Sequence, residues 1–216
     1  MNNSKKLLKI KTYNDCIQYT YSNVCFTNRS SRKIKKNHSS KSEIFRCSIS
    51  RSISHIKELC LCNNFDWFFT LTLKTKKRNN ILYSTTYIRD SIKKYAKTHK
   101  DFKYLYVFEK QKKGGIHIHG FFSGFDDLYL NKNGHLSSKF FDKVGYQCFE
   151  RAFQVNPFYL IKYITKEPIV ELRQRYFRSR NLKTAEISYL HCNFEEFKNF
   201  PFTFRNEYCK MITVEK

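Results

Sequence analysis

Two histidines separated by one residue have the clearest potential for chemistry in this sequence. His117 and His119 lie in the segment GIHIHGFF, whose β-branched and aromatic residues predict a strand. Side chains at positions i and i+2 of a strand point to the same face, so both imidazoles would be available to one divalent ion. Taken alone, the pattern also fits two surface or core histidines without a ligand.

An acidic residue precedes the histidines at a spacing that suits a hairpin. Glu109 ends the segment KYLYVFE, which also reads as a strand, and the connection KQKKGG is short and ends in two glycines. If Glu109 lies opposite His117, its carboxylate joins the two imidazoles on one face. Two imidazoles and one carboxylate leave coordination positions open for phosphate oxygens and water, as a catalytic ion needs. The alternative for Glu109 is an ion pair with a nearby lysine.

A later helix carries two tyrosines and two lysines at helical spacing. Asn156 is a suitable N-cap for the segment FYLIKYITKE. Tyr159 and Tyr163 are four residues apart, as are Lys162 and Lys166, so each pair shares a helical face. A phenol with a pKa near ~10 is a poor nucleophile at neutral pH, and a nearby cation would improve it. The alternative is that the tyrosine face packs on a sheet while the lysines face solvent.

The charge of the chain indicates a polyanionic partner. The 216 residues include 41 Lys and Arg against 18 Asp and Glu, which gives a formal net charge of +23. Nucleic acid is the commonest partner for such a field, although a generally basic surface is the alternative. With 41% hydrophobic and 17% aromatic residues the chain is not disordered, and rings remain to stack on bases. The basic runs expected to track phosphates contain Lys74, Lys76, Lys77, Arg78, Lys110, Lys112, Lys113, Arg178 and Arg180.

The order of the expected elements predicts an α+β fold with a central antiparallel sheet of about five strands and helices mainly on one face. We expect a basic, poorly patterned leader over residues 1–46, a main domain over 47–183, and C-terminal strands over 184–216 packed on that domain. Ser84 is the expected N-cap of the second helix. The expected helices cover 51–62, 84–97, a weak one at 136–142 and the tyrosine helix; the expected strands cover 68–73, 103–109, 115–122 and 146–153.

The cysteines and the hydropathy pattern predict a cytoplasmic protein with free thiols. The eight cysteines are scattered without a CxxC pair, and no apolar run suits a signal peptide or a membrane span. A zinc site at Cys60 and Cys62 with a distant histidine is an alternative, although CxC lacks the usual ligand spacing.

The ordered set FFTLTL, E-x7-HIH preceded by GG, and YLIKYITK resembles the HUH endonuclease superfamily of rolling-circle replication initiators. It is most similar to the replication-associated proteins of small circular single-stranded DNA phages and of Gram-positive plasmids. The later segment RSRNLK adds to the resemblance, which covers roughly residues 50–183. It implies a ferredoxin-like or RRM-like sheet and places the endonuclease domain at 47–183.

The resemblance also implies roles for the residues named above. His117 and His119 match the metal-binding pair, and Glu109 matches the acidic ligand, with Mg²⁺ or Mn²⁺ as cofactor. Tyr163 matches the nucleophile and has Lys166 beside it. Tyr159 matches the second tyrosine of two-tyrosine phage initiators, which plasmid-type relatives lack.

The activity implied is nicking and joining of single-stranded DNA at a replication origin in a bacterial cytoplasm. A host helicase and a host DNA polymerase are the expected partners, because the sequence has no G-x-x-x-x-G-K-[ST] loop of its own. An HUH tyrosine transposase and a nonenzymatic RRM-like nucleic-acid-binding protein are the alternatives.

Overall fold

The computed structural model describes residues 6–22, 41–74, 80–111, 115–156, 158–164, 169, 172, 174–192, 201–205 and 209–216. The chain divides into two compact units, one made of residues 1–44 together with 183–216 and the other of residues 45–182. The second unit covers nearly the range in which we expect the main domain. Each unit is described by itself.

The unit of residues 45–182 is built on a five-stranded antiparallel sheet, and the expected α+β fold class is confirmed. Its strand order is β8-β3-β5-β4-β9, and every neighbouring pair is antiparallel. The strands are β3 (Trp67–Leu73), β4 (Lys103–Lys110), β5 (Ile116–Ser123), β8 (Gly145–Arg151) and β9 (Phe177–Arg178). A separate ribbon pairs β6 (Leu128–Leu130) with β7 (Leu136–Ser138).

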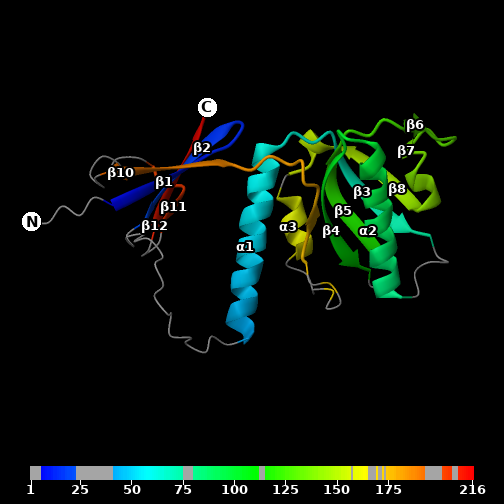
Figure 1. The fold of residues 1–216 in the computed structure, drawn as a ribbon, viewed down its shortest axis with the longest axis horizontal. Coiled ribbons are helices and arrows are strands. Elements are labelled where there is room, and N and C mark those ends of the chain that lie inside the picture. The colour runs from blue at the N-terminus through cyan, green and yellow to red at the C-terminus, as the bar shows by residue number, and fades with distance from the viewer. Residues whose placement is uncertain are drawn as a thin grey trace, which may run out of the picture. The chain divides into compact units, whose positions relative to one another are not determined.

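Helices cover both faces of this sheet (Figure 1). On one face, α1 (Lys41–Cys62) buries Ile56 and Leu59, and α3 (Tyr159–Ile164) buries Leu160 and Ile164, all among sheet residues such as Phe68. On the other face, α2 (Ile81–Thr98) packs Ile88, Ile92 and Tyr95 against Phe69, Leu71 and Leu73 of β3. The expected placement mainly on one face therefore holds for α1 and α3, while α2 takes the opposite face.

Strand parity assigns different chemistry to the two faces of the sheet. Alternate residues of a strand point to opposite sides. On β3, the residues facing α2 are apolar and fully buried, whereas Thr70 and Thr72 point to the side of α1 and α3. On β5, His117 and His119 share that polar side. One face of the sheet thus supplies a closed aromatic core, and the other carries the polar groups.

The unit of residues 1–44 and 183–216 corrects the expectation of a poorly patterned leader. Its described strands β1 (Lys6–Thr12) and β2 (Cys16–Ser22) pair with β10 (Glu186–Cys192) and β12 (Cys209–Glu215) in the order β10-β1-β2-β12-β11, with β11 (Phe204–Arg205) at the edge. The segments KLLKIKT and CIQYTYS alternate in polarity, but their outer strand partners lie near the other end of the chain, where local pattern gives no signal. The C-terminal strands therefore have β1 and β2 as their partners.

Two further local expectations are corrected. Helix α2 begins earlier than expected, because Asn80 is its N-cap and accepts a hydrogen bond from the backbone N–H of Tyr83 at 3.1 Å. Ser84 instead lies buried inside the helix. The weak helix expected over 136–142 is replaced by β7 and the 3₁₀ turn η2 (Phe141–Lys143), and a second 3₁₀ turn, η3 (Ala152–Gln154), follows β8.

Gly120 in the middle of β5 allows the close approach of β4. A Cβ atom built on Gly120 would lie 2.5 Å from the carbonyl oxygen of Leu105 and 2.5 Å from the Cβ of Tyr106, closer than any such contact can be. We expect Gly120→Ala to lower the free energy of unfolding by about 1–3 kcal/mol, because the added methyl group must push the two strands apart. Chemical denaturation measures this.

Ser54→Ala, at an exposed position of α1, is the matched control and should stay within about 0.5 kcal/mol of the wild type. A Gly120→Ala variant with an unchanged denaturation midpoint would contradict the packing described for β4 and β5.

Candidate active site

The hairpin of β4 and β5 brings the carboxylate and the two imidazoles together. Glu109 is paired directly with His117, so the register expected from the sequence is confirmed. His119, two residues along β5, lies on the same face, and the ring centroids of the two histidines are 6.0 Å apart. The Nε2 atom of His119 lies 2.8 Å from the Oε2 atom of Glu109. The three side chains expected to bind a metal therefore share one side of the sheet.

His119 is held from both ends of its ring. The Oγ1 of Thr70 lies 3.0 Å from Nδ1, opposite the contact with Glu109. Both residues of the contact are mostly buried, with side-chain exposures of 11% for His119 and 19% for Glu109. An oxygen at each ring nitrogen fixes the orientation of the imidazole, as the outer partners of metal-binding histidines do.

The donor set has the chemistry of a divalent-ion site, but the three groups do not all converge in this structure. The imidazole of His117 lies beside Thr72, whose Oγ1 is 3.4 Å from both ring nitrogens. Within the described part of the chain, no three His, Cys, Asp or Glu side chains form a group that could hold a metal ion. His119 and Glu109 are in place as a pair, and His117 is near them on the same face.

Tyr163 faces the histidine pair from the adjoining helix. Its ring stacks on that of His119, with centroids 4.1 Å apart and an angle of 11° between the planes. The helix α3 is anchored because Leu160 and Ile164 are buried against β4 and α1, which turns Tyr159 and Tyr163 to the other side. Tyr159 meets Tyr163 edge to face at 5.4 Å and Phe68 at 5.5 Å. The candidate nucleophile is thus in direct contact with one of the candidate metal ligands, His119.

A small cavity opens beside these rings. Its volume is about 380 Å³, and it is formed by β3, β5, the end of β8 and the start of α3. Its lining consists of Phe68, Thr70, His119, Glu150, Gln154, Val155, Asn156, Tyr159 and Tyr163. Both tyrosines and one of the histidines therefore border a common space.

The surroundings of Tyr163 hold its phenol in the protonated form. Burial is the main cause of its raised pKa; a hydrogen bond with Tyr159 and the negative charges of Glu109 and Glu150 act in the same direction. Each effect disfavours a phenolate, so a cation is needed to make this oxygen nucleophilic near neutral pH.

Of the two lysines expected near the tyrosines, the structure describes only Lys162. Lys162 is exposed, and its ammonium lies 5.3 Å from the ring centroid of Tyr159. Lys166 lies outside the described residues. Lys162 therefore lies beside Tyr159, the tyrosine three residues before it in the sequence.

The basic residues expected to bind DNA are only partly described. Lys74 donates a hydrogen bond to the carbonyl oxygen of Asp142 at 2.6 Å, and Lys110 is exposed at the end of β4. Arg178 and Arg180 border a second, larger cavity. The remaining expected contacts, Lys76, Lys77, Arg78, Lys112 and Lys113, lie outside the described residues.

Five cysteines of the described part of the chain are outside disulfide bonds: Cys16, Cys47, Cys60, Cys62 and Cys148. Burial raises the pKa of Cys60 to about 12, so without a metal this thiol stays protonated at neutral pH. The alternative of a zinc site at Cys60 and Cys62 therefore has no support in the described residues.

Four site residues were not identified from the sequence. Thr70 and Thr72 share a face by parity, but only the pairing of β3 with β5 places that face beside the histidines. Phe68 and Glu150 are opposite one another in the pairing of β3 with β8, strands that lie far apart in the sequence. No local pattern could have revealed that register.

Fold and site together define an α+β protein in which one face of an antiparallel sheet holds two histidines and a carboxylate against a tyrosine from a helix. Residues 66–168, just under half of the chain, match a family model of replication-associated proteins, the one that takes its name from the ORF2 protein. The match runs from the start of β3 to just beyond α3 and contains every side chain of the site. The likeness supports a role in the initiation of replication. Curated proteins and solved structures give no match to the chain.

Within the described residues, no helix combines the length and the apolar character needed to cross a membrane.

The charges around Tyr163 make its titration testable. Relative to an ordinary tyrosine with a pKa of 10.0, Tyr163 should ionise at higher pH, and Glu150→Gln should lower its pKa by removing a negative charge. The difference in ultraviolet absorbance between the protein and its Tyr163→Phe variant follows this ionisation. Because the folded-state pKa is raised, the associated stability is present below about pH 10 and is lost as the pH rises through the folded value.

Glu186→Gln, an exposed carboxylate on β10, is the control and should leave the titration of Tyr163 unchanged. A Tyr163 phenol that ionises below the ordinary value would show that the described surroundings are wrong.

Proposed function

We propose that this protein nicks and rejoins single-stranded DNA to start rolling-circle replication, with Tyr163 as the nucleophile. The observation that supports this most directly is the contact of the Tyr163 ring with His119, which is itself hydrogen-bonded to Glu109. The match to a replication-associated family agrees with this role.

The reaction is a transesterification. The phenol oxygen of Tyr163 attacks the scissile phosphorus, the bond between phosphorus and the 3′-oxygen breaks, and the phenol proton ends on that 3′-oxygen. The products are a 5′-phosphotyrosyl linkage and a free 3′-hydroxyl. Because the new ester replaces the old one, strand closure in the reverse direction needs no ATP, and the 3′-hydroxyl can prime a host polymerase.

The residues of the hairpin are suited to hold Mg²⁺ or Mn²⁺. With its Nδ1 proton donated to Thr70, His119 would present an Nε2 lone pair beside the carboxylate of Glu109, and these two groups would hold the ion. His117 would complete the set by turning away from Thr72. When bound, the ion supplies positive charge that polarises the scissile phosphate.

The remaining residues around the tyrosine have positioning roles. His119 stacks on the ring of Tyr163 and fixes its orientation. Leu160 and Ile164 anchor α3, the helix that carries Tyr163. Tyr159 shares a hydrogen bond with Tyr163 and is 39% exposed, so it is placed to take a second strand-transfer step. Lys162 lies over its ring and would steady a phenolate there.

Replacing the nucleophile is the direct test of the reaction. Tyr163→Phe should abolish the covalent protein–DNA adduct, because it removes the attacking oxygen but keeps the ring that stacks on His119. The adduct is detected on a denaturing gel after incubation with circular single-stranded DNA and Mn²⁺. Tyr159→Phe is the matched control and should still form an adduct in the first round, and adduct formation by Tyr163→Phe at the wild-type level would reject Tyr163 as the nucleophile.

The partner of His119 gives a separate test of the metal site. Thr70→Val keeps the shape of the side chain but removes the oxygen at Nδ1, and losses of this kind cost about 10–100-fold in metal affinity or activity. We expect the Mn²⁺ concentration for half-maximal nicking to rise accordingly. Thr86→Val, at an exposed position of α2, should leave this concentration unchanged.

Two outcomes would redirect the proposal. Nucleic-acid binding that survives EDTA, with no cleavage under any metal, would indicate the nonenzymatic RRM-like binder. Cleavage accompanied by integration of the strand into a second DNA, without replication of an origin plasmid, would indicate a transposase.

A further inference from the structure

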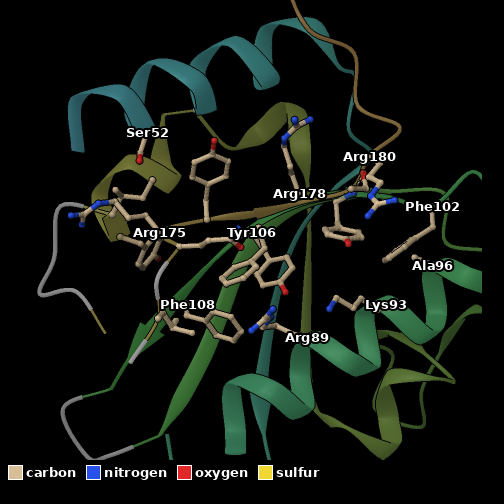
Figure 2. A pocket seen from close by; sticks show the side chains of 18 of the residues that line it. Ser52, Arg89, Lys93, Ala96, Phe102, Tyr106, Phe108, Arg175, Arg178 and Arg180 are labelled. Carbon is tan, nitrogen blue, oxygen red and sulfur yellow. Dashed lines mark hydrogen bonds between the residues drawn. The ribbon is translucent and has the colours of Figure 1, made fainter. Parts of the chain in front are cut away.

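A second cavity, much larger than the one beside the tyrosines, lies along the other edge of the sheet (Figure 2). Its volume is about 1220 Å³, above the ~300–1,000 Å³ typical of small-molecule sites. Side chains from α1, α2, β4 and residues 169, 172 and 174–181 surround it, and Figure 2 shows Ser52 of α1 on one side and Arg89 and Lys93 of α2 on the other. It has room for more than one nucleotide.

The cavity is strongly basic. Seven of its described lining residues are cationic, and none of the described ones is Asp or Glu. Arg89, Lys93 and Lys97 follow one another at four-residue spacing along α2, so they form a stripe beside its buried apolar face. The cations of the lining are Arg89, Lys93, Lys97, Lys100, Arg175, Arg178 and Arg180.

The floor of the cavity is aromatic. Three of its rings are partly exposed, those of Tyr104, Tyr176 and Phe177. The rings of Phe102, Tyr106 and Phe108, which also line it, are buried. Phe177 stacks on Tyr106 with centroids 5.3 Å apart. Flat rings beneath a basic rim are the combination that binds bases and phosphates of single strands together.

Arg89 belongs to the cationic rim, contacts a ring of the floor and has one nitrogen atom without a hydrogen-bond partner among the described residues. Its guanidinium carbon lies 5.0 Å from the centroid of Phe177. Its Nε atom is buried and has no hydrogen-bond partner among the described residues. A buried N–H without an acceptor is costly, and an incoming ligand with an acceptor atom would remove that cost.

From these observations we infer that the cavity binds a short stretch of single-stranded DNA, with bases against the aromatic floor, an acceptor atom on Arg89, and phosphates at the cationic rim. The inference rests on the proposed function in one respect: it takes the strand to be the one that Tyr163 cuts. Tyr163 lines both this cavity and the smaller one, so a strand held here leads directly to the candidate nucleophile.

The test is equilibrium binding of a fluorescein-labelled oligothymidylate to the full chain in EDTA, followed by fluorescence anisotropy. Lys93→Gln and Arg89→Met should each weaken binding by about tenfold, in the range that stacking and phosphate contacts contribute. Lys94→Gln is the matched control: it removes the same charge from the next residue of α2, outside the cavity lining, and should change binding less than about twofold.

Two competitors separate the possible ligands without any variant. An abasic oligomer of the same length keeps the phosphates but lacks bases, and it should compete about tenfold less well. Thymidine monophosphate at equal nucleotide concentration should also compete poorly, because it spans only one position. Equal competition by the abasic oligomer would overturn base binding, and equal competition by the monophosphate would replace the strand with a free nucleotide. Equal weakening by Lys94→Gln and Lys93→Gln would reduce the effect to general charge.

The readout is independent of cleavage. The loss of binding that Lys93→Gln and Arg89→Met cause in EDTA reports the cavity, whereas the covalent adduct in Mn²⁺ reports Tyr163 and its metal site. Normal binding with no adduct would defeat the proposed function and leave the cavity's ligand standing, and the reverse result would defeat only the cavity assignment.

Discussion

The antiparallel register of β4 and β5 is the constraint on which the site depends. Glu109 and His117 are directly opposed, and a slip of one residue would turn the carboxylate or the imidazoles to the opposite face, among the aromatic rings packed under α2. The register is favoured because β4 lies too close to Gly120 for any side chain at that position, and because the other face is filled by buried rings. A close-packed apolar face thus determines the placement of the polar one.

Electrostatics and packing oppose each other at the tyrosine. Packing brings the Tyr163 ring against His119 through a helix with two buried anchors, Leu160 and Ile164. Burial and the nearby carboxylates raise the pKa of the same phenol, so the proposed nucleophile is held in its protonated form. Under the proposed function, a site of this kind would be inactive until a cation is bound.

Sequence patterns predicted the parts of the fold that are local. Three features depend on residues near one another in the sequence, so they could be predicted from it. They are the alternation of β3, the hairpin after Glu109 and the spacing of Tyr159 and Tyr163. The pairing of β3 with β8, which brings Glu150 to the tyrosines, joins distant segments, and so does the pairing of β1 with β10. The basic cavity could not be predicted either, because α2 supplies one wall and residues 174–181 supply another.

The strand order of the other sheet bears on how this chain folds as it leaves the ribosome. Leu8 is paired with Leu190, and Cys16 with Glu215, so β1 and β2 are synthesised long before their outer partners exist. The sheet with the candidate site draws every partner from residues 67–178 and can close earlier. Because pairing across a long sequence separation is slow, the emerging hairpin of β1 and β2 spends most of translation with two bare edges. Lys9 and Lys11 of β1 are charges of the kind that oppose pairing of a bare edge with neighbouring chains.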